Sequence, residues 1–155
     1  MSDVPPILAH LVRSKAETQP DFPVLTFANI AADGNFVDEV RTYAALWRRG
    51  CMTARVLAAK GVKTGDRFAL IMQNHPEFIE AMVAASILGA VFVPIDPRTK
   101  GEKLVYMLEF AECTGAIVAD YALANLSDVL PRLPRLAWIG TFGTKTSGMS
   151  DSRLF

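Results

Sequence analysis

The 155-residue sequence predicts an α/β fold: a parallel, Rossmann-like sheet with helices on both faces, preceded by an N-terminal β-hairpin. Three observations support this prediction. Apolar runs of strand length alternate with amphipathic stretches, which is typical of parallel strands joined by crossover helices. The apolar runs lack polar alternation, as strands covered on both sides do. An Asp-Gly turn between two short strand-like segments indicates the hairpin.

The first 41 residues predict a short helix followed by this hairpin. Pro5 and Pro6 can open the helix, and Gln19-Pro20 closes it. Its apolar residues are expected on one face: Ile7, Leu8, Leu11 and Val12. Residues 24–30 and 36–41 then form two strands around Asp33-Gly34, where positive φ angles suit a tight turn.

A longer helix is predicted between Thr42, a good N-cap, and Gly61, which suits the position after a helix end. Its apolar stripe contains Tyr43, Leu46, Trp47, Cys51, Ala54, Leu57 and Ala58. The opposite face is basic and includes Arg48, Arg49, Arg55 and Lys60. A solvated face is the favoured interpretation of these cations, and a phosphate-binding patch is the alternative.

The rest of the chain alternates strands and helices. Four strands are predicted, at 67–72, 90–95, 116–120 and 135–140. One helix begins at Pro76, capped by Asn74 or His75, and a second begins at a Thr99-to-Glu102 capping box. A weaker helix is expected from Ala122 to Leu130, before Pro131. Residues 141–155 have no periodicity and are rich in Ser, Thr and Gly.

Charge and cysteine content exclude several functions. Sixteen Lys and Arg balance sixteen Asp and Glu, so nucleic acid is not an expected partner. Cys51 and Cys113 lack metal-ligand spacing and are expected to be free thiols. Residues 81–95 are uncharged but reach only about 22 Å as a helix, too short for a membrane span. The first residues do not follow a signal-peptide pattern, so a cytoplasmic location is expected.

No phosphate loop or catalytic constellation is apparent. The segment after the first parallel strand, Met72 to Glu77, lacks the glycines of a dinucleotide fingerprint. Gly140 to Thr146 follows a strand, but only two residues separate its glycines and a threonine precedes its lysine, unlike a Walker loop. No nucleophile elbow or Ser/His/Asp pattern is present, and we predict no catalytic or metal-binding residue.

Four segments follow one another at a characteristic spacing. They are RTYAALW (41–47), KGVKTGDRFAL (60–70), NHPEF (74–78) and LGAVFVPIDPR (88–98). In this order they resemble the N-terminal region of AMP-forming acyl-CoA synthetases, a superfamily that also contains luciferases and the adenylation domains of peptide synthetases. The resemblance covers residues 5–140. Each segment alone is a common turn, cap or buried strand, so the order and spacing are what make it specific.

The resemblance implies an adenylate-forming ligase that activates a carboxylic acid with ATP and Mg²⁺ and transfers the acyl group to coenzyme A. Residues 1–140 are then its N-terminal α/β subdomain, and residues 141–155 are a flexible tail or the start of a loop. One binding residue is matched: Arg98, after Asp96-Pro97, resembles an arginine that approaches the nucleotide phosphates of coenzyme A. An exposed turn arginine without a ligand is the alternative.

Other family motifs have no match here. The phosphate loop, adenine-contacting segment, ribose-binding acid, hinge and C-terminal lysine would lie beyond Phe155. We therefore expect no cofactor in this chain, no activity from it alone, and the remainder of a ligase chain as its partner. Two alternatives stay open: a stand-alone α/β interaction or oligomerisation module, and an autonomous nucleotide-binding enzyme.

The sequence is more apolar than usual for its size. With glycine included, about 55% of the residues are apolar, against about 45–50% in typical domains. Because the membrane explanation fails, the excess predicts exposed apolar patches larger than those of ordinary monomers. A second copy of the chain is the expected cover, which makes the protein a homo-oligomer.

Overall fold

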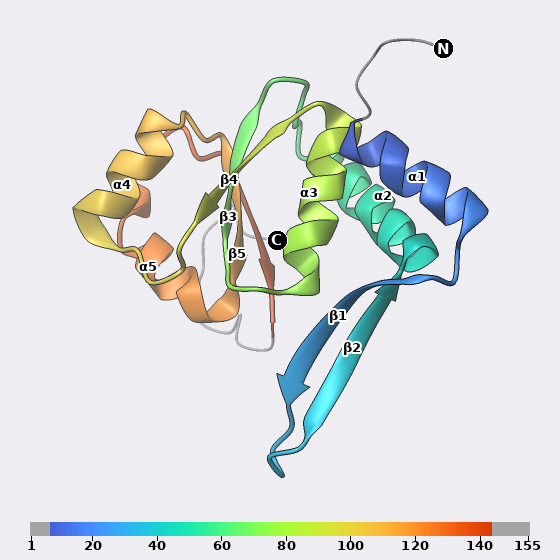
Figure 1. The fold of residues 1–155 in the computed structure, drawn as a ribbon. Coiled ribbons are helices and arrows are strands. Elements are labelled where there is room, and N and C mark those ends of the chain that lie inside the picture. The colour runs from blue at the N-terminus through green and yellow to red at the C-terminus, as the bar shows by residue number, and fades with distance from the viewer. Residues whose placement is uncertain (1–6, 144–155) are drawn as a thin grey trace. The chain divides into compact units, whose positions relative to one another are not determined.

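The structure is a computed structural model that describes residues 7–143, and it divides into two compact units (Figure 1). The first unit comprises residues up to Gly61 together with 74–89, and the second comprises residues 62–73 together with those from Ala90 onward. Residues 144–155, most of the predicted tail, lie outside the described residues. The predicted domain boundaries therefore stay a prediction.

The first unit combines helices with the predicted hairpin. It contains α1 (Leu8–Thr18), β1 (Pro23–Ile30), β2 (Phe36–Thr42), α2 (Tyr43–Ala59) and α3 (Pro76–Leu88). The strands pair antiparallel with Ile30 opposite Phe36, as the Asp-Gly turn predicts. In the turn, Gly34 has a φ of 85°, and the backbone N–H of Asn35 donates to Asp33 over 3.0 Å.

Local signals set the ends of α2, as predicted. The hydroxyl of Thr42 accepts from the backbone N–H of Ala45 at 3.2 Å, and Gly61 follows the helix end with a φ of 88°. The buried face of α1 differs from the prediction, because Ala9 and Val12 are buried while Leu8 and Leu11 are exposed. Ser86 of α3 explains this orientation, since its hydroxyl accepts from the backbone N–H of Ala9 at 3.0 Å.

The distal half of the hairpin projects away from the helices of its unit (Figure 1) and carries apolar side chains. Ile30 and Phe36, paired at its tip, are 71% and 77% exposed. These exposed apolar side chains agree with the exposed apolar surface predicted from the sequence. That a second copy of the chain covers this surface stays a prediction.

The second unit contains the predicted parallel sheet. Its elements are β3 (Arg67–Ile71), β4 (Val91–Ile95), α4 (Gly101–Phe110), β5 (Gly115–Ala119), η1 (Asp120–Ala122), α5 (Leu123–Ser127), η2 (Leu130–Arg132) and β6 (Trp138–Phe142). The strand order is β4-β3-β5-β6, and every pairing is parallel. The hairpin and the parallel sheet confirm the predicted α/β class.

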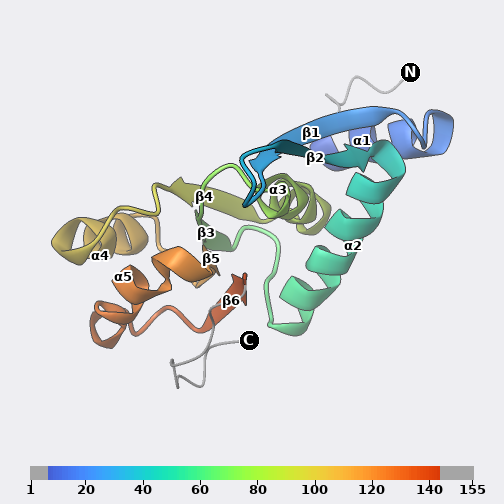
Figure 2. The ribbon, with the colours of Figure 1, turned by 90° about the horizontal axis from the view of Figure 1, so that it is seen from below.

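Helices α4 and α5 lie on the same side of this sheet in both views (Figures 1 and 2). Inward-facing strand residues and helix residues form one core: Ala69, Ile71, Ile95, Leu104, Leu108, Ala116, Val118, Leu126 and Ile139. Alternate residues of each strand contribute to this core, because successive side chains point to opposite faces of a sheet.

Three predicted boundaries in this unit were wrong. The helix expected from Ala122 to Leu130 is divided into η1, α5 and η2, with Pro131 inside η2. The strand expected at 135–140 begins at Trp138, because a turn in which Leu136 donates to the carbonyl of Leu133 delays it.

The third correction concerns the start of α4. Lys100, and not Thr99, is its N-cap, and no side chain caps the helix. The backbone N–H of Thr99 is held by the carbonyl of Asp96 at 2.9 Å, and Glu102 is bound by Arg132 instead of reaching back to the cap. Among the helices described between residues 7 and 143, none combines the length and apolar character needed to cross a membrane.

Candidate functional site

The carboxyl edge of the parallel sheet is the expected place for a ligand. The chain runs outward from β3 to β4, then returns across β3 to form β5. In open α/β sheets, ligands bind outside the carboxyl ends of the strands, at the point where the strand order reverses. Here that point lies between the ends of β3 and β5.

The only sequence-predicted site residue, Arg98, lies in a turn at this edge, directly after β4. Its backbone N–H donates to Asp96 Oδ1 at 2.8 Å. Its Nε donates to the same oxygen at 3.0 Å, and its terminal nitrogen donates to Oδ2 at 2.6 Å. The amide of Asn125 in α5 donates to the Pro97 carbonyl at 3.1 Å, which ties the turn to that helix.

The Asp96–Arg98 pair is exposed to solvent, with 85% of the Arg98 side chain accessible. Hydrogen bonds from the side chain and the backbone of Arg98 lower the pKa of Asp96 to about 2. The hydrogen bond and charge of Asp96 in turn raise the pKa of Arg98. The carboxylate therefore holds the guanidinium fork in the bidentate geometry that a phosphate would also use.

Sequence reasoning missed a contact at the strand-order reversal. The hydroxyl of Tyr121 accepts from the backbone N–H of Gln73 at 2.7 Å, which joins the segments after β5 and β3. Next to it, the carboxylate of Asp120 lies so close to Gly143 that a Cβ there would fall 2.5 Å from Asp120 Cγ. Gln73, Asp120, Tyr121 and Gly143 all lie one or two residues after the end of a parallel strand, a positional signal that could have identified the group.

The remaining candidates are divided between the two units. His75 is the N-cap of α3 in the first unit, without a capping side-chain bond. Cys51 and Cys113 are both free, as predicted, and belong to different units. Burial raises the pKa of the Cys113 thiol to about 11. The positive charge of Arg67 opposes this rise but does not cancel it. The described residues contain no group of three side chains suited to holding a metal ion.

Comparisons with known proteins cover most of the chain. The profile of the AMP-binding enzyme family matches residues 12–146. Delta-poly-L-ornithine synthetase of Acinetobacter baumannii (strain AB307-0294) is 30% identical over 135 residues, which are 87% of this chain and 9% of that protein. Feruloyl-CoA synthase of Amycolatopsis sp is 37% identical over 94 residues, covering 53% of this chain and 19% of that protein.

A solved structure has the same fold. Acetoacetyl-CoA synthetase from Streptomyces lividans matches with a TM-score of 0.81 over 96% of this chain and 24% of that chain, at 20% sequence identity. The chain thus spans less than a quarter of this structure and of both sequence relatives.

Proposed function

Because this chain belongs to the AMP-binding enzyme family and corresponds to an N-terminal portion of such an enzyme, we propose that it works within an ATP-dependent acid–thiol ligase. The acceptor in this proposal is coenzyme A. The family match over residues 12–146 carries the adenylating part of the proposal. The exposed arginine at the carboxyl edge of the sheet, together with the similarity to a feruloyl-CoA synthase, supports coenzyme A.

The proposed reaction has two steps. A carboxylate oxygen of the acid attacks the α-phosphorus of ATP, and the bond to the departing pyrophosphate breaks, which leaves an acyl adenylate. The thiolate of coenzyme A then attacks the acyl carbonyl, and AMP leaves as the thioester forms. Adenylation is needed because a free carboxylate is a poor electrophile. We assign no step of this reaction to a metal ligand of this chain.

Arg98 is the residue of this chain that we assign to the ligand. Its guanidinium is exposed and prearranged by Asp96, two residues earlier. Exposed ion pairs contribute little to stability, so a phosphate can replace the Asp96 carboxylate at small cost. A forked guanidinium binds phosphate oxygens in two parallel hydrogen bonds, which a lysine does not reproduce.

Calorimetric titration with coenzyme A of the enzyme that contains this chain tests this role. We expect Arg98→Met to weaken binding about fivefold, the effect of an exposed charge contact. Arg55→Met, which removes an exposed arginine from α2, is the matched control and should bind as the parent chain does. Equal affinities in all three proteins would overturn the assignment of Arg98.

The similarity to delta-poly-L-ornithine synthetase favours a second candidate, an adenylating enzyme that acts on an amino acid. That similarity extends over 87% of the chain, against 53% for the feruloyl-CoA synthase. Exchange of labelled pyrophosphate into ATP separates the two candidates when it is measured on the enzyme that contains this chain. Exchange that depends on amino acids, without coenzyme A binding, would support the second candidate against the first.

A further inference from the structure

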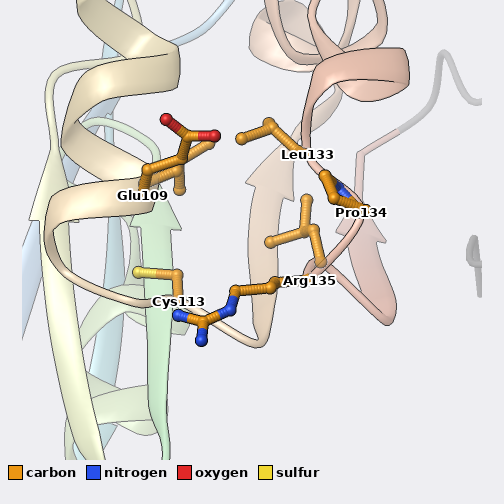
Figure 3. Close-up of a pocket in the computed structure, with 7 residues that line it drawn as sticks. Glu109, Cys113, Leu133, Pro134 and Arg135 are labelled. Carbon is orange, nitrogen blue, oxygen red and sulfur yellow. The ribbon is translucent and has the colours of Figure 1, made fainter.

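A cavity of about 310 Å³ lies at the opposite, amino edge of the sheet, between the last turn of α4 and the loop that precedes β6 (Figure 3). Its inner wall is apolar and buried, and it is formed by Leu108, Cys113, Leu133 and Leu136. This volume is at the lower end of small-molecule sites and equals that of about ten water molecules. It would accommodate a ligand of roughly ten non-hydrogen atoms.

The two ends of the cavity carry opposite charges. Figure 3 shows the Glu109 carboxylate at one end and the Arg135 guanidinium at the other. Arg135 has its nearest carboxylate oxygen, from Glu112, at 3.6 Å, which is beyond hydrogen-bond distance. Within residues 7–143, no ion pair involves Glu109.

Other charged side chains near the cavity already form ion pairs with one another. Arg132 donates to both carboxylate oxygens of Glu102, and Arg67 pairs with Glu112. The charge of Glu109 contributes to the raised pKa of Arg132 only after that of Glu102. Among the charged side chains that line this cavity, Glu109 and Arg135 therefore keep hydrogen-bonding capacity for a ligand.

We propose that this cavity binds a small zwitterion whose ammonium and carboxylate groups stand at opposite ends of an apolar body. The ammonium group contacts Glu109, the apolar body packs against the leucines and Cys113, and the carboxylate contacts Arg135. A molecule with one charge would leave the other end of the site without a partner. An α-amino acid does not fit this pattern, because its two charges are adjacent.

Protection of Cys113 from alkylation tests the proposal, with Cys51 as a control in the same molecule. The probe is 6-aminohexanoate, and the comparison compounds are hexanoate and hexylamine, which each lack one charge. The 155-residue chain is alkylated at pH 9, where part of the thiol is ionised, and mass spectrometry follows each cysteine separately. We expect 6-aminohexanoate to slow the alkylation of Cys113 and to leave the rate at Cys51 unchanged.

Two substitutions at exposed positions separate binding from folding. Glu109→Gln and Arg135→Met should each raise the 6-aminohexanoate concentration needed for half-maximal protection about fivefold. Arg55→Met, the matched control, should leave that concentration unchanged. Circular dichroism checks that each variant keeps the fold.

Three results would overturn the proposal. The first is equal protection by all three compounds, which would show that the charges are not recognised. The second is protection of Cys51 together with Cys113, which indicates a general effect on the chain. The third is the absence of protection by 6-aminohexanoate. None of these results bears on coenzyme A binding by Arg98, because that residue lies at the other edge of the sheet.

Discussion

Each unit of the chain contains an arginine held by a carboxylate, and the two pairs differ in burial. In the first unit, Nε of Arg41 donates to Glu80 at 2.9 Å, and the two side chains are 7% and 6% exposed. In the second unit, Asp96 binds Arg98, and the side chains are 48% and 85% exposed. The hydrogen-bond distances in the two pairs are similar, so the pairs differ in their exposure to solvent and not in their geometry.

The buried Arg41–Glu80 pair has a structural role, whereas the exposed Asp96–Arg98 pair is available to a ligand. Arg41 also donates to Glu39 at 2.6 Å, and these carboxylates raise its pKa against the lowering effect of burial. Removing one partner of a buried pair leaves a charge without water or a counterion. Either member of the exposed pair can exchange its partner for water, because solvent screens both charges, and Arg98 can also exchange its partner for a phosphate.

Breaking the buried pair should produce the largest effect. We expect Glu80→Ala to reduce the free energy of unfolding by about 3–5 kcal/mol, since Arg41 stays buried and the carboxylate that it still binds, Glu39, is half-exposed. Urea denaturation followed by circular dichroism measures the loss. Glu80→Gln, which keeps a hydrogen-bond acceptor, should lose less.

Replacing both members of that pair provides a further control. The double variant Arg41→Met with Glu80→Leu should regain much of the lost stability, because a well-packed apolar pair avoids the cost of burying charge. A loss below about 1 kcal/mol for Glu80→Ala would mean that the pair behaves like an exposed one.

Separating the helices that bring Glu80 to Arg41 should have the next largest effect. A Cβ at Gly50 of α2 would lie 2.5 Å from Val83 Cγ1 and 3.6 Å from the Glu80 carbonyl of α3. Gly50→Ala should therefore displace α3 and cost about 1–3 kcal/mol of unfolding free energy. In a double-mutant cycle, Val83→Ala should recover part of this loss. Simple additivity of the two changes would contradict the close approach.

Local signals in the sequence predicted which segments form helices and strands. The residue at which α4 begins depends also on contacts that the local pattern does not contain. Thr42 and Gly61 specify the ends of α2 through their own backbone preferences, so that helix could be predicted. Thr99 also has the residue type of an N-cap, yet a turn hydrogen bond to Asp96 and the long-range contact between Glu102 and Arg132 override it. A one-dimensional pattern contains no information about such competition.

The two ion pairs also show that contacts between residues close in sequence can be predicted, whereas contacts between distant residues cannot. Asp96 and Arg98 are two residues apart around a proline, so their turn could be predicted from the sequence. Arg41 and Glu80 are 39 residues apart, and their pairing depends on how α3 packs against α2. Only the resemblance to a family identified Arg98 as a candidate, because an exposed turn arginine has no distinctive pattern of its own.

The exposed pair should respond to pH without affecting stability strongly at neutral pH. Because Arg98 lowers the pKa of Asp96 from 3.8 to about 2, the pair stabilises the folded state above the unfolded value of 3.8. This stabilisation is lost as the pH falls through 3.8 toward 2, when the carboxylate is protonated in the folded state. Carbon-detected NMR of the Asp96 carboxyl group measures the titration directly.

Arg98→Met should return the pKa of Asp96 toward 3.8, because that side chain supplies the hydrogen bond that lowers it most. The unfolding midpoint of the variant at pH 7 should match that of the parent chain, since solvent screens the pair. If Asp96 titrated near 3.8 in both proteins, the carboxylate would not hold the guanidinium in solution. In that case Arg98 would lack the prearranged geometry on which its proposed phosphate contact depends.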